Sequence, residues 1–319
     1  MTDLNTCSPK YSIVIPVYRS KETLDELYES LTRVMDSLGE EYEIVLVNDG
    51  SPDDSWNKLK ALREKDKRLS IVNLMRNYGQ HNALMCGFAQ SNGRYVITMD
   101  DDLQHPPEEI PKLIDSIENS DTDVVVGRYG EKKHNLFRNF GTWFMKQLYW
   151  HTMQIPKNLD MTSFRIIKKE IVDAALRFKV PAPRVDLIMF SITTNMSNVE
   201  ISHAPRKAGK SGYTLRKLIS NTLDNVLNYS SLPLRVVSYF GMIVSAFSVA
   251  LSIYYLTLFL VGGTSVSGFT TLVLLTVFFG GAILMTLGIV GEYLTRIIRS
   301  CEQKPSYVIR EHRGSKHAP

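Results

Sequence analysis

An apolar strand that runs directly into an acidic loop is the most informative part of this sequence. The stretch reads Tyr95-Val96-Ile97-Thr98-Met99-Asp100-Asp101-Asp102-Leu103-Gln104-His105-Pro106-Pro107-Glu108. Adjacent carboxylates repel one another unless positive charge lies among them. Oxygen ligands of this kind suit a hard divalent cation such as magnesium or manganese. Asp102 and Gln104 fit as a ligand pair, because alternate residues of an extended chain can converge on one ion.

Strand and helix patterns alternate on both sides of this stretch. Strands are expected over 11–17, 42–47, 70–74, 95–99 and 123–128, and helices over 23–38, 54–65 and 82–90. Such alternation predicts an α/β domain with a mostly parallel, Rossmann-like sheet and helices on both faces. Ligands of these sheets bind outside the carboxyl ends of the strands. Asp49 and the Asp100–Asp102 run both follow strands, so we expect them to face one crevice, with Arg128 at the same edge.

A long apolar stretch follows much later in the chain. No charged residue occurs between Val236 and Gly291. A membrane span needs about 20 residues, so this stretch is too long for one. We predict two transmembrane helices, over 234–261 and 269–290, joined by a turn at 262–268. A buried helical hairpin in a soluble protein is the alternative.

Charge and composition extend this organisation. Both flanks of the apolar stretch carry Lys and Arg whereas the turn carries none, which places both flanks in the cytoplasm. We therefore predict a cytoplasmic domain over 1–212, an interfacial amphipathic helix over 213–233, the transmembrane hairpin over 234–291 and a cytoplasmic tail over 292–319. The segment 134–150 reads either as a second interfacial helix or as a core helix. A net charge of +4 does not indicate a nucleic-acid partner.

Several motifs resemble glycosyltransferase family 2 with the GT-A fold. They are Val14-Ile15-Pro16-Val17-Tyr18, Val47-Asn48-Asp49-Gly50-Ser51, Arg76-Asn77-Tyr78-Gly79-Gln80, Asp100 to Glu108, Thr162-Ser163-Phe164-Arg165, Arg206 to Tyr213, and Gly291-Glu292-Tyr293-Leu294. The chain is most similar to the polyprenyl-phosphate branch, which includes dolichol-phosphate mannose synthase-like and bacterial undecaprenyl-phosphate glycosyltransferases. The resemblance runs from about Tyr11 to Tyr307.

The resemblance implies a role for each matching residue. It assigns the nucleotide site to Pro16, Tyr18, Asp49, Arg76, Asn77, Gly79 and Asp100. It assigns the metal, Mg²⁺ or Mn²⁺, to Asp102 and Gln104. The catalytic set is Asp102 with the phosphate-binding cations Arg128, Arg165, Arg206 and Lys210. Attraction to anionic lipid is an alternative role for the last two.

The implied activity is metal-dependent, inverting transfer of one sugar from a nucleotide diphosphate sugar to polyprenyl phosphate at the bacterial plasma membrane. UDP-glucose, UDP-N-acetylglucosamine, another UDP-hexose and GDP-mannose all fit, with a UDP-hexose preferred, and relatives suggest a homotetramer. Two other functions stay open, transfer to a lipid hydroxyl such as that of diacylglycerol, and a non-catalytic membrane scaffold. Ser163 stands where some relatives carry Asp, which leaves the presence of a catalytic base open. Asp101 occupies a variable position, so its substitution is expected to matter least.

Overall fold

The computed structural model describes residues 9–129, 159–160, 162–178, 183–202, 268–301 and 305–314, with scattered positions from 239 to 261. Most of them form one sheet of eight strands in the order β7-β5-β6-β4-β1-β2-β3-β8. The strands are β1 (Tyr11–Val17), β2 (Tyr42–Asn48), β3 (Leu69–Leu74), β4 (Tyr95–Thr98), β5 (Val124–Tyr129), β6 (Arg165–Lys168), β7 (Met196–Ile201) and β8 (Ile309–Arg313). The four central strands β4, β1, β2 and β3 are parallel, which confirms the predicted sheet type.

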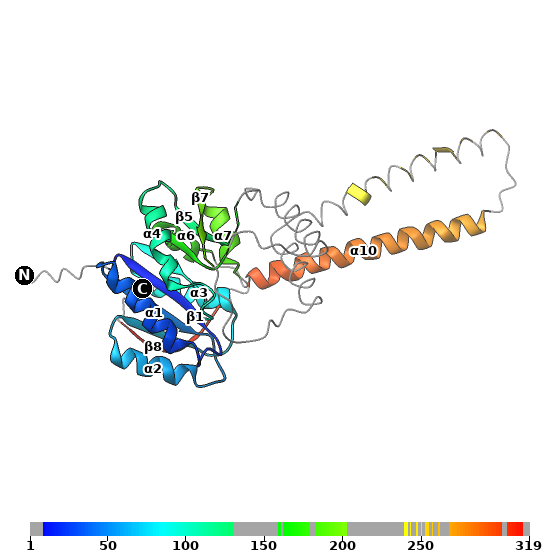
Figure 1. Ribbon diagram of the computed structural model, residues 1–319. Coiled ribbons are helices and arrows are strands. Elements are labelled where there is room, and N and C mark those ends of the chain that lie inside the picture. The colour runs from blue at the N-terminus through cyan, green and yellow to red at the C-terminus, as the bar shows by residue number, and fades with distance from the viewer. Residues whose placement is uncertain are drawn as a thin grey trace, which may run out of the picture. The chain divides into compact units, whose positions relative to one another are not determined.

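Helices cover both faces of the sheet (Figure 1). They are α1 (Leu24–Ser37), α2 (Ser55–Lys65), α3 (Gln80–Gln90), α4 (Ile110–Glu118), α6 (Lys169–Leu176) and α7 (Val185–Ile192). The helices α1, α2 and α4 pack on one face, with Ile13 and Ile15 of β1. The helices α3, α6 and α7 pack on the other face, where Val14 lies. Successive β1 side chains thus enter opposite cores, because side chains alternate along a strand.

The strand order reverses beside β1, and this reversal positions the site. The chain passes from β1 to β2 and β3 on one side, and β4 then pairs with the other side of β1. The loops that follow β1 and β4 therefore leave neighbouring strand ends at the reversal point. In open α/β sheets the ligand crevice lies at this point, so the loops after β1, β2 and β4 are expected to line it.

The end of the chain holds a strand that sequence reasoning did not predict. The segment 292–319 was expected to be a tail, but β8 lies within it and pairs antiparallel with β3. Its register runs from Ile71 opposite Arg313 to Leu74 opposite Ile309. The hydrophobic pattern of β8 is weak because its side chains are exposed or only partly buried at the sheet edge.

The second predicted transmembrane helix is longer than expected. Helix α10 runs from Phe269 to Cys301, beyond the predicted end at 290. No proline follows until Pro305, so nothing in the sequence stops the helix at its first charged residues. Among the described residues, α10 alone has the length and composition to cross a membrane, with a mean hydropathy of 1.4 over Phe278–Thr295. The predicted first helix, 234–261, is described only at scattered positions, and the segments 134–150 and 213–233 lie outside the described residues.

Candidate active site

One cavity gathers most of the predicted nucleotide-site residues at the carboxyl edge of the sheet. It has a volume of about 250 Å³. Its lining residues are Pro16, Val17, Tyr18, Asp49, Asn77, Gly79, Gln80, Asp100, Asp101 and Asp102. They follow β1, β2, β3 and β4, so segments far apart in the sequence meet at the reversal point of the strand order.

Asp49 organises the floor of this cavity. It is 3% exposed and accepts hydrogen bonds from the backbone amides of Tyr78, at 2.7 Å, and Gly79, at 2.8 Å. Burial raises the pKa of Asp49, and the two amide bonds oppose that shift. Gly50 has a φ of +62°, and a Cβ there would lie 2.6 Å from the nitrogen of Asn77, so only glycine fits beneath this loop.

Asp100 is held by three neighbours. Its Oδ2 accepts a hydrogen bond from Ser163 Oγ at 2.6 Å, and its Oδ1 accepts one from Gln80 Nε2 at 2.6 Å. His105 Nε2 lies 3.6 Å from the same Oδ2. Burial alone would raise the pKa of Asp100, but the interactions with His105 and Ser163 lower it below its usual range. Asp100 is therefore an oriented carboxylate at neutral pH.

His105 is itself fixed on both sides. Its ring stacks on Tyr129, with centroids 5.6 Å apart, and on Phe164, with centroids 5.3 Å apart. Its ring nitrogens bond to the Tyr129 hydroxyl and to Ser163 Oγ. The loop after β4 is thus locked to β5 and to the segment that precedes β6.

Asp102 and Gln104 lie in contact, and the backbone between them is not extended as the sequence analysis expected. Gln104 donates from Nε2 to Asp102 Oδ2 at 2.6 Å, and its backbone amide donates to Oδ1 at 3.1 Å. Leu103 between them has a φ of 59°, in the left-handed region, and its side chain is buried. This turn, which is unfavourable for leucine, brings the two polar side chains together.

The donor atoms of this pair fit a hard divalent cation. A carboxylate and an amide oxygen are ligands that Mg²⁺ and Mn²⁺ accept. Among the described residues no three His, Cys, Asp or Glu side chains form a metal-binding group. A cation held by this pair would take the rest of its ligands from substrate phosphates and water.

Asp101 makes structural contacts that its variable position in the family motif does not indicate. Its carboxylate accepts hydrogen bonds from the Tyr18 amide, at 3.0 Å, and from Ser20 Oγ. Its backbone carbonyl accepts a hydrogen bond from Thr23 Oγ1 at 2.8 Å. Burial raises the pKa of Asp101 to about 6. Asp101 thus joins the acidic loop to the turn after β1, where Arg19 adopts a φ of 57°.

The variant Asp101→Ala is expected to weaken nucleotide binding about tenfold. It leaves the Tyr18 amide and the Ser20 hydroxyl without their acceptor, a loss of about 1–3 kcal/mol of loop stability. Titration calorimetry with a nucleoside diphosphate measures the effect. Asp101→Asn is the matched control, because it keeps an acceptor oxygen and removes a repelling charge. Unchanged affinity in the alanine variant would show that the turn after β1 is held by other contacts.

Substitution of Ser163 by aspartate is also expected to lower activity. A carboxylate at this position would face Asp100, because the serine hydroxyl lies 2.6 Å from Asp100 Oδ2. Ser163→Asp is therefore expected to displace Asp100 or raise its pKa, and to lower transfer activity by at least about tenfold. Ser163→Thr, which keeps a hydroxyl, is the control. A gain of activity in the aspartate variant would instead identify position 163 as the site of a general base.

The predicted phosphate-binding arginines lie in different environments. Arg165 begins β6 beside the end of β4, is 2% exposed, and donates from Nε to Thr98 Oγ1 at 3.3 Å. Among the described residues no carboxylate lies within ion-pair distance of it, and burial lowers its pKa.

Arg128 is exposed near the end of β5. Arg76 is exposed and lies over the Tyr78 ring, 4.9 Å from its centroid. None of the three lines the cavity, and Arg206 and Lys210 lie outside the described residues.

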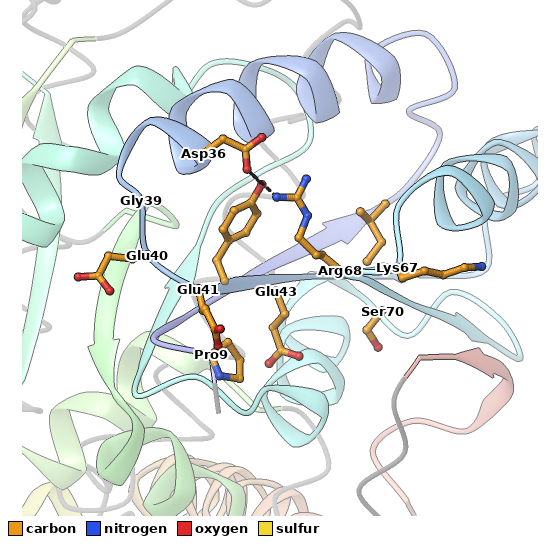
Figure 2. A pocket seen from close by; sticks show the side chains of 11 residues that line it. Pro9, Asp36, Gly39, Glu40, Glu41, Glu43, Lys67, Arg68 and Ser70 are labelled. Carbon is orange, nitrogen blue, oxygen red and sulfur yellow. Dashed lines mark hydrogen bonds and ion pairs between the residues drawn. The ribbon is translucent and has the colours of Figure 1, made fainter. Parts of the chain in front are cut away.

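A larger hollow of about 590 Å³ lies at the amino ends of β2 and β3, opposite to the candidate site (Figure 2). Glu40, Glu41 and Glu43 line it, together with Arg68. Arg68 forms an ion pair with Asp36, and Glu43 accepts a hydrogen bond from the Ser12 hydroxyl. None of the residues expected at the nucleotide or metal site lines this hollow.

Sequence reasoning missed several residues of the site. Gln80, Asp101, His105 and Tyr129 all hold loops or carboxylates in place. Gln80 and His105 lie inside the family motifs quoted above, and this position was the sequence feature that could have identified them as site residues. Tyr129 ends β5 and meets His105 only through the sheet order, so no local pattern could identify it.

Solved structures share this fold. The glucosyl-3-phosphoglycerate synthase of Mycobacterium tuberculosis, solved with Mn²⁺, UDP and phosphoglyceric acid, has a TM-score of 0.51 and 16% identity, and the match covers 69% of this chain and 76% of that chain. The same synthase with Mn²⁺, UDP-glucose and phosphoglyceric acid has a TM-score of 0.51 and 15% identity, over 69% and 78%. The likeness confirms a GT-A-like α/β fold.

Relatives match over nearly the whole chain. The undecaprenyl-phosphate 4-deoxy-4-formamido-L-arabinose transferase of Proteus mirabilis is 33% identical over 310 residues, covering 96% of this chain and 95% of the relative. An uncharacterized glycosyltransferase, YkcC of Bacillus subtilis, is 30% identical over 307 residues, covering 96% and 94%. The model of glycosyl transferase family 2 matches residues 12–176, which hold the whole described cavity. The chain therefore belongs to glycosyl transferase family 2.

Proposed function

We propose that this glycosyltransferase moves one sugar from a UDP-hexose to polyprenyl phosphate, with inversion, at the cytoplasmic face of the bacterial plasma membrane. One observation carries the proposal. Six residues expected at the nucleotide site line a single cavity together with Asp102, the expected metal ligand; the six are Pro16, Tyr18, Asp49, Asn77, Gly79 and Asp100. A relative that matches 96% of the chain is named for transfer to undecaprenyl phosphate, which supports the acceptor.

The acceptor chemistry suits the absence of a carboxylate at position 163. A phosphate monoester has a second pKa of about 6 and is largely dianionic at cytoplasmic pH. Its oxygen can attack the anomeric carbon directly, forming the new C–O bond as the bond to the nucleotide diphosphate breaks. No proton needs removal, unlike in attack by a hydroxyl. Ser163 instead orients Asp100 on the donor side of the cavity.

Positive charge is what the reaction requires from the protein. Donor and acceptor are both anionic, and cations positioned where charge develops lower the barrier. Arg165 is preorganised by burial, and Arg128 extends to solvent at the same edge. A divalent cation held by Asp102 and Gln104 would offset charge on the departing diphosphate. Arg206 and Lys210 belong to the same proposed cation set.

The membrane part of the proposal rests on composition. We place transmembrane helices over 234–261 and 269–290, an interfacial helix over 213–233, and a homotetramer around them. The helix α10 supports one of the two spans. The uncharged turn and basic flanks support a cytoplasmic catalytic domain.

The test is a transfer assay on membranes that contain the full chain. Labelled UDP-glucose, UDP-N-acetylglucosamine, GDP-mannose and UDP-4-deoxy-4-formamido-L-arabinose are each supplied with undecaprenyl phosphate, with or without Mn²⁺. A lipid-linked sugar from a UDP-hexose, dependent on the cation, is the expected result, and transfer from the pentose donor UDP-4-deoxy-4-formamido-L-arabinose alone would contradict the proposed hexose. Transfer to diacylglycerol alone, or nucleotide binding without transfer to either lipid, would contradict the proposal.

A further inference from the structure

The strand β8 is attached to a loop that serves the nucleotide cavity. We name residues 75–79, between β3 and α3, the donor loop. The Met75 amide donates to the Val308 carbonyl at 2.9 Å, and Arg310 Nη2 donates to the Met75 carbonyl at 3.0 Å. Both backbone groups at the start of the donor loop are thus occupied by the C-terminal segment. The β3–β8 pairing also shifts register between Asn73 and Leu74, immediately before the loop.

The other end of the donor loop forms the cavity. Asn77 and Gly79 line it, and the Tyr78 and Gly79 amides donate to Asp49. The loop is short, so a displacement at Met75 moves the residues at its far end. Gly79, the N-cap residue of α3, has a φ of +93°, a backbone conformation that favours glycine. The contacts at Met75 therefore limit where the cavity-lining residues can lie.

A second contact ties the same segment to α3. Tyr307 is partly buried and packs on the core face that holds Ala83, Leu84 and Cys86 of α3. Burial raises the pKa of Tyr307 to about 12, and its hydroxyl interacts with the Cys86 thiol. The segment 305–314 thus contacts both β3, which precedes the donor loop, and α3, which follows it.

We infer that β8 positions the donor loop for nucleotide binding, with Arg310 as a positioning residue. The inference rests on the nucleotide-binding function proposed above. The family model ends at residue 176, so β8 lies outside the part of the chain that it matches. Nucleotide affinity is then set by two segments separated by more than 200 residues, and not by the matched domain alone.

Arg310→Ala in the full-length chain tests the inference. We expect the Kd for UDP to rise about fivefold, because one exposed hydrogen bond to the loop is lost. The KM for the sugar donor rises similarly, while kcat at saturating donor and the KM for the lipid stay within about twofold. Arg313→Ala is the matched control, since Arg313 lies on the same strand and binds Glu311 at 2.7 Å, away from the loop. Arg310→Lys is expected to restore part of the affinity.

Hydrogen exchange provides a readout that does not depend on nucleotide. The Tyr78 and Gly79 amides are expected to exchange faster in Arg310→Ala than in Arg313→Ala, without a change over β1 or β2. In a chain that ends at Lys304, these amides should exchange faster still. If that shortened chain does not fold, the comparison of Arg310→Ala with Arg313→Ala is the test. If wild-type protein binds no nucleotide, the proposed function fails while the exchange comparison still tests the loop. The inference is overturned if the wild-type protein binds UDP and Arg310→Ala shows the same UDP affinity and the same amide exchange as Arg313→Ala.

Discussion

Asp102→Ala is expected to lose about 10³-fold or more in transfer rate, while the protein still enters membranes and folds. The side chain lines the cavity and accepts a hydrogen bond from Gln104 Nε2, and these two residues are the proposed ligand pair for a divalent cation. Removing the carboxylate leaves the leaving diphosphate without that cation. Initial rates are measured across a Mn²⁺ and Mg²⁺ titration, because a weakened site shifts the midpoint before it abolishes turnover.

Two controls separate metal binding from loop damage. Gln104→Glu keeps an oxygen ligand and is expected to retain cation-dependent activity, with a changed metal preference. Asp101→Asn changes the charge of the same acidic run without touching the proposed ligand pair. Turnover like that of wild type in Asp102→Ala would remove Asp102 from the catalytic set.

Arg165→Met is the second substitution with a large expected effect. It is expected to lower the transfer rate without lowering the stability of the protein. We expect transfer to fall about 10³-fold because the proposed phosphate-binding cation set loses a buried member. The melting temperature is expected to stay unchanged or rise. A buried charge without a close partner costs several kcal/mol, and methionine fills a similar volume without that cost. Differential scanning fluorimetry and initial rates on the same preparation measure both effects.

Arg68→Met is the matched comparison. Arg68 binds Asp36 and Asp66 at the opposite edge of the sheet, beside the hollow in Figure 2. Its loss is expected to lower the melting temperature and leave transfer intact. A large loss of stability in Arg165→Met, with residual activity in proportion to folded protein, would assign Arg165 to the structure instead.

Local patterns predicted the central fold well. The strands β1 to β5 and helices α1 to α3 lie within one or two residues of their expected ranges, because buried runs and helical spacing are properties of short segments. The convergence of Asp49 with the acidic loop followed from parallel strand ends. The motifs then supplied residues such as Asn77 and Gly79, whose role is carried by the backbone.

Long-range contacts set the limit of prediction. Asp101 looked replaceable because nothing near it in sequence shows that it binds the Tyr18 amide and Ser20. The strand β8 was missed because an edge strand with exposed side chains lacks a hydrophobic pattern. The extended backbone expected between Asp102 and Gln104 was wrong, because the left-handed conformation of buried Leu103 depends on its core contacts. The binding of one ion by this pair stays a prediction.

The edge position of β8 has a consequence for biosynthesis. A ribosome makes the chain from its amino end, so β3 is complete long before β8 exists. Until then β3 exposes an unpaired edge, which is a hazard for association with other chains. The helix α10 leaves the ribosome before β8 does, so delivery of the apolar segment comes before completion of the sheet. A nascent chain that has not yet reached β8 therefore lacks the two contacts that this segment makes with Met75.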